Sequence, residues 1–183
     1  MPLLQPLTLE TADEEGRELL GQVQKKYGFV PNLLGNLAHA PKTAQAYLTL
    51  GELLGETSFD ATEQQVVLLA VSRYNRCEYC VGAHSAISAM QNLPADVIAS
   101  IRDDQPIADE KLEALRAFTT KVVDQRGWLS EADSDAFLAA GYDQRQILEV
   151  ILGVAMKTIS NYTNHIAETE LDAAFADFAW QGT

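Results

Sequence analysis

The spacing of apolar residues is the feature that most constrains the fold of this chain. Through most of its 183 residues, apolar side chains recur three or four positions apart, as they do along one face of a helix. The alternation of apolar and polar residues that marks a half-buried strand is nearly absent. We therefore expect an all-α fold, a single-domain helical bundle that extends over residues 1–183.

Capping residues and helix breakers divide the chain into helices. Thr11-Ala12-Asp13-Glu14 has the form of a capping box, and Gly28 can end the helix that follows. Asp60 precedes a helix that is apolar on most sides. Residues 1–10 are expected to form an extended arm. Further helices are predicted over residues 33–39, 42–54, 77–91, 109–125, 130–140 and 143–167, with a short helix from Pro94 and a last turn or two within 171–180.

The charge of the chain excludes several classes of partner. With 26 acidic and 13 basic residues the net charge is −13, which repels nucleic-acid phosphates and anionic lipid headgroups. The acidic residues are spread along the chain, as on a solvated surface. The amino terminus lacks a basic stretch followed by an apolar run, and no segment approaches the roughly 20 apolar residues of a membrane helix. We expect a cytoplasmic protein with no nucleic-acid or membrane partner.

The chain has two cysteines, and their spacing suggests a chemical purpose. Cys77, Cys80 and His84 fall on one face of the helix predicted there. A helix amino terminus favours a thiolate over a thiol. Two thiols this close can form a disulfide after one has reacted with a peroxide to give a sulfenic acid, and a histidine one turn away can move the proton. The pattern therefore predicts a thiol redox site with no cofactor.

Other interpretations of the same residues remain open. Cys77, Cys80 and His84 could ligate a metal, with His165 or water as the fourth ligand, although structural zinc sites usually present a second ligand pair that this chain lacks. The cysteines could also be buried apolar residues, which their charged neighbours Arg76 and Glu78 disfavour. A thioredoxin fold would need strands that the sequence does not contain. A redox-sensing or metal-binding helical module is thus the non-enzymatic alternative.

The region around the cysteines is similar to a known family. Residues 64–84, within a core motif region over 60–92, resemble the AhpD-like alkylhydroperoxidases of the carboxymuconolactone decarboxylase family. Residues 28–33, 39–41 and 161–165 resemble its longer peroxidase-related members. The resemblance implies an AhpD-like helical bundle that assembles into trimers or hexamers. It also implies an enzyme that reduces hydroperoxides and is recharged by a dithiol or a lipoylated protein.

The resemblance also implies roles for the site residues. Cys80 would form the sulfenic acid, Cys77 would donate a proton and complete the disulfide, and His84 would be the family's histidine. The wider family is named for the decarboxylation of a muconolactone, which is the alternative enzymatic function. Members with that activity typically lack the cysteine pair.

The sequence departs from the family pattern at two positions, which makes four residues candidates for accessory roles. Gln65 stands twelve residues before Cys77, where the family usually has a glutamate that takes up a proton. Glu63 lies about 200° away around the helix and has the spacing of a capping residue. Tyr79 stands where the best-known members carry a histidine, and His165 is a further histidine that could replace it.

Overall fold

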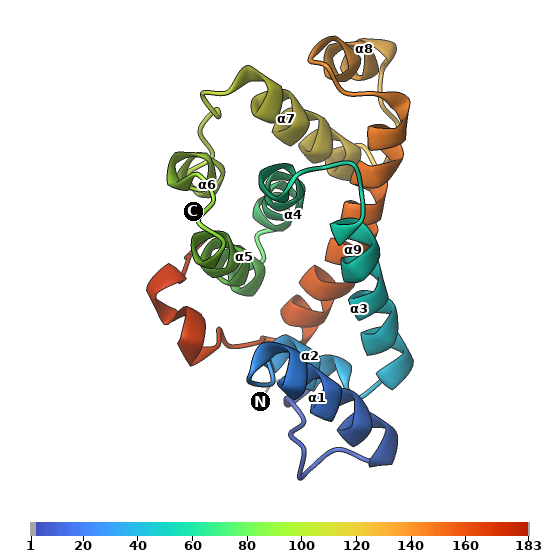
Figure 1. The fold of residues 1–183 in the computed structure, drawn as a ribbon, viewed down its shortest axis with the longest axis vertical. Helices are drawn as coiled ribbons and strands as arrows, with labels where there is room; N and C mark the ends of the chain where they lie inside the picture. The colour runs from blue at the N-terminus through green and yellow to red at the C-terminus, as the bar shows by residue number, and fades with distance from the viewer. Residues whose placement is uncertain (1–2, 183) are drawn as a thin grey trace.

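The computed structural model describes residues 3–182, which contain helices and no strand (Figure 1). The all-α, single-domain bundle expected from the sequence is confirmed. Its helices are α1 (Glu14–Tyr27), α2 (Asn32–Leu37), α3 (Pro41–Gly55), α4 (Ala61–Tyr74), α5 (Glu78–Met90), α6 (Ala95–Arg102), α7 (Glu110–Asp124), α8 (Glu131–Ala139) and α9 (Gln144–Ala167), followed by the 3₁₀ helix η1 (Ala173–Phe178).

Most helix ends lie where the sequence predicts them, with one corrected cap. The carboxylate of Asp13, and not Thr11, caps α1 by accepting a hydrogen bond from the amide of Gly16 at 2.8 Å. The Thr11 hydroxyl instead accepts a hydrogen bond from the amide of Thr8, which closes the preceding turn. Gly28 ends α1 with a φ of 84°, a left-handed conformation that glycine adopts without strain.

Helix α4 forms the centre of the bundle. Val66, Val67, Leu69 and Val71 are fully buried on it, so almost no side of the helix faces water. It packs against α5, α6, α7 and α9, which surround it in Figure 1. Burial of each such side chain stabilises the fold by about 1.5–3 kcal/mol. The nearly all-apolar composition of this segment is thereby explained.

A glycine allows α9 to lie close against α4. A Cβ atom placed on Gly153 would come within 2.6 Å of Cγ1 of Val67, which real Cβ atoms do not tolerate. Any larger residue at position 153 would therefore push the two helices apart. The close approach fixes α9, whose following turns carry the polar side chains that reach α5.

The amino-terminal helices and the end of the chain enclose the other side of α5. A buried apolar cluster there includes Leu33 and Leu37 of α2, Phe175 of η1 and both cysteines. Before α1 the described residues form turns and irregular structure, and the amide of Leu7 donates a hydrogen bond to the carbonyl of Gly35 at 3.0 Å. The first two residues of the predicted arm lie outside the described residues.

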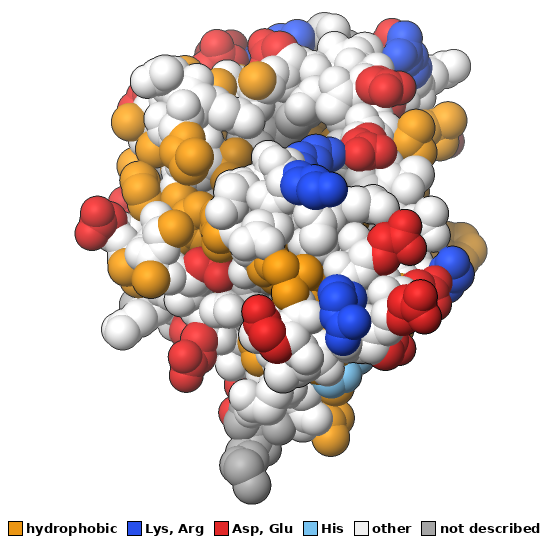
Figure 2. All heavy atoms as spheres, turned by 60° about the horizontal axis from the view of Figure 1, so that its bottom comes forward, with side chains coloured by type: hydrophobic (Ala, Val, Ile, Leu, Met, Phe, Trp, Pro, Cys, Tyr) orange, Lys and Arg blue, Asp and Glu red, His pale blue; other side chains and the backbone are white. Residues whose placement is uncertain are grey.

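The surface carries its acidic side chains in a scattered pattern. On the face drawn in Figure 2, acidic and basic side chains are scattered and the acidic ones do not form a single patch, while many hydrophobic side chains gather on the left of the view. Among residues 3–182, no helix combines the length and apolar character needed to cross a membrane.

Candidate active site

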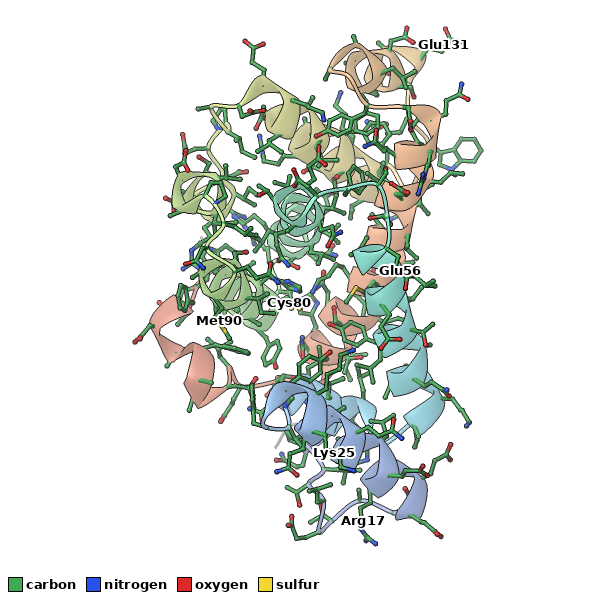
Figure 3. All side chains as sticks on the ribbon, viewed as in Figure 1. Arg17, Lys25, Glu56, Cys80, Met90 and Glu131 are labelled. Carbon is green, nitrogen blue, oxygen red and sulfur yellow. The ribbon has the colours of Figure 1, made fainter. Side chains whose placement is uncertain are left out.

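Both cysteines lie at the start of α5, in the interior of the bundle. Arg76 adopts a left-handed φ of 56° and turns the chain from α4 into α5. Cys77 is the N-cap residue of α5, and Cys80 lies in its first turn. Cys77 is 0% and Cys80 1% exposed, and neither forms a disulfide. Figure 3 shows Cys80 inside the molecule, in contrast to Arg17 and Glu131 at its periphery.

A cavity of about 550 Å³ reaches Cys80 and His84. Its walls come from α1, α2, α3, α5, α9 and η1 and consist mainly of aromatic and aliphatic side chains. Tyr27 and Met90, which also line it, are 46% and 75% exposed and therefore lie towards its opening. Cys77 does not line this cavity. The two thiols thus differ in access, and Cys80 is the one that a small molecule can meet.

Helix α9 presents two carboxamides to the sulfur atoms. The side-chain amide of Asn161 donates a hydrogen bond to Sγ of Cys80 at 3.0 Å, and that of Asn164 donates one at 3.2 Å. Asn164 also lies 3.8 Å from Sγ of Cys77. The hydroxyl of Ser160 is 3.9 Å from Sγ of Cys80. Donors aimed at a sulfur stabilise its negatively charged form.

The surroundings shift the pKa values of the two thiols in opposite directions. Burial alone would raise the pKa of Cys80, but the hydrogen bond from Cys77, the charge of Lys157 and the two carboxamides together lower it to about 5. The hydrogen bond to Cys80 raises the pKa of Cys77, and burial raises it further. The pair therefore holds a thiolate on Cys80 and a proton on Cys77 at neutral pH.

His84 is held in one orientation by Gln65. Its Nδ1 atom lies 3.0 Å from Oε1 of Gln65, and both side chains are buried. Because a glutamine oxygen only accepts hydrogen bonds, Nδ1 carries the proton and Nε2 keeps its lone pair. Burial lowers the pKa of His84, and the charge of Lys157 lowers it further. His84 is therefore neutral and ready to accept a proton at Nε2.

The other predicted accessory residues contact different partners. Oε2 of Glu63 accepts a hydrogen bond from the amide of Asp60 at 3.0 Å in a capping box, and its other oxygen pairs with Lys111 at 3.1 Å. The hydroxyl of Tyr79 donates to Asp172 at 2.6 Å.

His165 is exposed near the end of α9. Of the predicted residues, the site thus brings together Cys77, Cys80, His84 and Gln65, and Tyr79 lines the same cavity while its hydroxyl is bonded to Asp172.

The contribution of α9 to the site was not predicted from the sequence. Lys157, Ser160, Asn161 and Asn164 are buried polar residues on one face of this helix. Their three and four residue spacing within an otherwise apolar segment is the signal that could have revealed them. Among residues 3–182, no three histidine, cysteine, aspartate or glutamate side chains are grouped so that they could hold a metal ion.

Comparisons with known proteins agree with this architecture. The model of the carboxymuconolactone decarboxylase family matches residues 41–121. The crystal structure of an alkylhydroperoxidase AhpD core, an uncharacterized peroxidase-related protein from Ralstonia eutropha, is 24% identical, with a TM-score of 0.78 and 94% of each chain covered. A peroxidase-related protein from a Silicibacter species is 21% identical, with the same TM-score and coverage.

A third solved structure has a different recorded activity. The debrominase Bmp8 in complex with 2,3,4-tribromopyrrole is 17% identical, with a TM-score of 0.78 over 97% of this chain and 96% of the other. A search of curated proteins found no match. The resemblance noted for residues 64–84 is therefore confirmed: residues 41–121 match the model of the carboxymuconolactone decarboxylase family, and the chain has the helical fold of the AhpD core.

Proposed function

We propose that this protein is a thiol-dependent hydroperoxide reductase in which Cys80 is the peroxide-reactive residue. The observation that carries the proposal is the difference in access between the cysteines. Cys80 lines the cavity beside His84, whereas Cys77 is buried outside its walls. The lowered pKa of Cys80 supports the same assignment, because the thiolate is the nucleophile in such reactions.

In the oxidative half of the cycle, the thiolate of Cys80 attacks the terminal oxygen of the hydroperoxide. The sulfur–oxygen bond forms as the oxygen–oxygen bond breaks, which leaves a sulfenic acid on Cys80 and an alkoxide. The proton of Cys77, released as the charge on Cys80 disappears, converts the alkoxide to an alcohol. The Cys77 thiolate then attacks Cys80, and the sulfenic oxygen leaves as water after protonation.

The reductive half of the cycle needs an external dithiol. A dithiol compound or a lipoylated protein would attack the Cys77–Cys80 disulfide and be oxidised to its own disulfide as both protein thiols reform. Neutral His84 is placed to accept the proton of the incoming thiol at Nε2. The cycle uses no bound cofactor. Its demand for dithiol fits a reducing compartment such as the cytoplasm.

The shape of the cavity favours organic hydroperoxides over hydrogen peroxide. Phe29, Leu33, Leu48 and Phe175 give it apolar walls, and burial of an alkyl or aryl group there would contribute about 25 cal/mol for each Å² removed from water. We expect turnover to increase with the apolar size of the peroxide until the cavity is filled.

We also propose that the protein is a homo-oligomer, a trimer or hexamer. The outer side of α9 exposes Leu148, Ile151, Tyr162 and Ile166, which self-association would remove from water. Sedimentation is expected to give a mass of at least three chains at micromolar concentration, and a monomer would contradict the proposal.

A second candidate function, reductive dehalogenation, would use the same thiols. The cavity has aromatic walls at Tyr27, Phe29, Tyr47 and Phe175, which suit a flat aromatic ligand. Two thiols can supply two electrons, so that a carbon–bromine bond is replaced by carbon–hydrogen while bromide leaves and the disulfide closes. Bromide release from 2,3,4-tribromopyrrole, in the presence of a dithiol and without peroxide activity, would favour this alternative.

The test is peroxide consumption with cumene hydroperoxide and dihydrolipoamide. The wild type is expected to consume peroxide catalytically, and Cys80→Ser is expected to lose this activity entirely. Cys77→Ser is the matched variant: it should react with one equivalent of peroxide and then stop, because no second thiol resolves the sulfenic acid. Equal turnover in the wild type and Cys80→Ser would overturn the proposal.

A further inference from the structure

Lys157 is a buried lysine in the wall of the active-site cavity. It lies on α9 and is 1% exposed, and it lines the cavity together with Cys80 and His84. Asn161 and Asn164, four and seven residues further along the same helix face, donate hydrogen bonds to Sγ of Cys80. Lys157 therefore belongs to the helix face that meets the thiols.

Lys157 differs from the ion-paired lysines of the described residues. Among residues 3–182, the ion pairs involve Lys26, Lys42, Lys111 and Lys121, all with side chains about half or more exposed, and none involves Lys157. Burial of an ammonium group without a negative partner costs several kcal/mol. Among residues 3–182 no carboxylate forms an ion pair with Lys157, so a negative partner for it would have to be another kind of group.

The groups that face Lys157 leave one candidate for that charge. Helix α5 contributes Cys77, Cys80 and His84, whose pKa values all respond to the charge of Lys157, and the Tyr47 phenol of α3 lines the same cavity. Tyr79 also lines the cavity, but its hydroxyl donates to Asp172. Two further charged groups of the cavity wall, Lys26 and Glu52, form an ion pair with each other at 2.9 Å. Cys80 alone both lines the cavity and receives two hydrogen bonds at its sulfur.

We propose that Lys157 is a positioning residue whose ammonium group is the counter-ion of the Cys80 thiolate. This inference rests on the proposed thiol function and extends it, because Gln65 leaves the site without the carboxylate that a proton relay would use. A fixed positive charge keeps Cys80 deprotonated in the resting enzyme without any proton acceptor. Burial is the main cause of the lowered pKa of His84, and the charge of Lys157 lowers it further.

The counter-ion has a consequence for the redox balance of the pair. Closing the Cys77–Cys80 disulfide removes the negative charge and leaves Lys157 without its partner. The reduced form is therefore the one that Lys157 stabilises, and a stabilised reduced form makes the disulfide more oxidising. Removal of the charge is expected to make the disulfide harder to reduce.

The test compares Lys157→Met, which keeps the length and removes the charge, with Lys157→Arg, which keeps the charge. The readout is the pH dependence of Cys80 alkylation by iodoacetamide, resolved from Cys77 by mass spectrometry. We expect the apparent pKa of Cys80 to rise by about one to three pH units in Lys157→Met. At a pH below both pKa values, alkylation should fall about tenfold for each pH unit by which the pKa rises. Lys157→Arg should stay near the wild type.

Two controls make the result specific. Lys42→Met removes an exposed lysine that pairs with Glu15, and it should leave Cys80 alkylation unchanged. Lys157→Gln is a second neutral variant with the same expected effect, should Lys157→Met fail to fold. An unchanged pH profile in a folded neutral variant, or an equal shift in Lys42→Met, would overturn the inference.

Alkylation requires no peroxide turnover, so this test and that of the proposed function can fail separately. A protein that consumes no peroxide but shows the Lys157-dependent profile would reject the function and retain the counter-ion. If the wild type consumes peroxide but Lys157→Met has an unchanged alkylation profile, the proposed function is retained and the counter-ion is rejected.

Discussion

The imidazole of His84 and the carboxamide of Gln65 form a buried hydrogen bond of 3.0 Å between α5 and α4. Gln65 fixes the tautomer of His84 but cannot take up a proton, so His84 cannot pass its Nδ1 proton to this neighbour. Its basicity at Nε2 is correspondingly low, since burial already lowers its pKa. Proton transfer in the reductive half of the cycle is therefore expected to limit turnover.

Gln65→Glu should increase turnover, because a carboxylate behind His84 would stabilise the protonated imidazole. We expect about a tenfold rise in kcat with dihydrolipoamide, less than the roughly 10²–10⁴-fold that a complete general acid–base group contributes. Gln65→Leu, which removes the hydrogen bond, should decrease kcat. Steady-state kinetics of the folded variants would check this, and a kcat for Gln65→Glu at or below the wild-type value would contradict it.

The carboxamides of α9 are expected to control the acidity of Cys80. Asn164→Leu removes a donor 3.2 Å from Sγ of Cys80, so the apparent pKa should rise by about one pH unit, the equivalent of one hydrogen bond to a charged group. Ser160→Ala is the matched control, because its hydroxyl is 3.9 Å from the sulfur and should matter less. Equal pH profiles of alkylation in Asn164→Leu and the wild type would argue against these donors.

The pH dependence follows from the pKa of Cys80, which is about 5 in the folded protein. Alkylation should be constant near neutral pH and fall as the pH drops through 5. The folded pKa lies below that of an unfolded cysteine, so the thiolate contributes stability that is present above about pH 8.5 and lost as the pH falls towards 5. Urea unfolding of wild type and Cys80→Ser should show this difference. Parallel stability curves would contradict the thiolate.

Tyr79 is expected to stabilise the fold and not to relay protons. Its hydroxyl donates to Oδ2 of the buried Asp172, whose other oxygen accepts a hydrogen bond from the amide of Asn32 at 2.9 Å. Tyr79→Phe leaves that carboxylate short of a donor, which should cost about 1–3 kcal/mol of unfolding free energy. Peroxide turnover per folded molecule should change little. A large loss of turnover without a loss of stability would instead assign Tyr79 to proton transfer.

The fold could be predicted closely because its signals are local. Three helices begin where the sequence predicts, and each is capped by the expected residue: Asp60, Ser130 or Asp143. Such caps can be predicted because capping depends on residues within one turn. The cap of α1 was misplaced by two residues because Thr11 and Asp13 are both good capping residues. Only the turn closed by Thr8 and Thr11 decides between them.

The site could be predicted only where its residues are close in the sequence. The helix spacing of Cys80 and His84 predicts that they share one helix face, and both line the same cavity. Asn161 meets Cys80 from 81 positions away, and no periodicity within either helix specifies that contact. The pairing depends on the close packing of α9 against α4 at Gly153, a tertiary feature. His165, in the same polar stretch as Asn164, points instead to the surface.

Mass spectrometry after addition of one equivalent of peroxide tests the proposed chemistry most directly. Trapping with dimedone should label Cys80 as a sulfenic acid at early times, most clearly in Cys77→Ser. In the wild type the Cys77–Cys80 disulfide should then form, and dimedone should no longer label Cys80 because its sulfenic acid has been consumed. If both cysteines remain thiols, or if Cys77 is oxidised first, then Cys80 is not the peroxide-reactive residue.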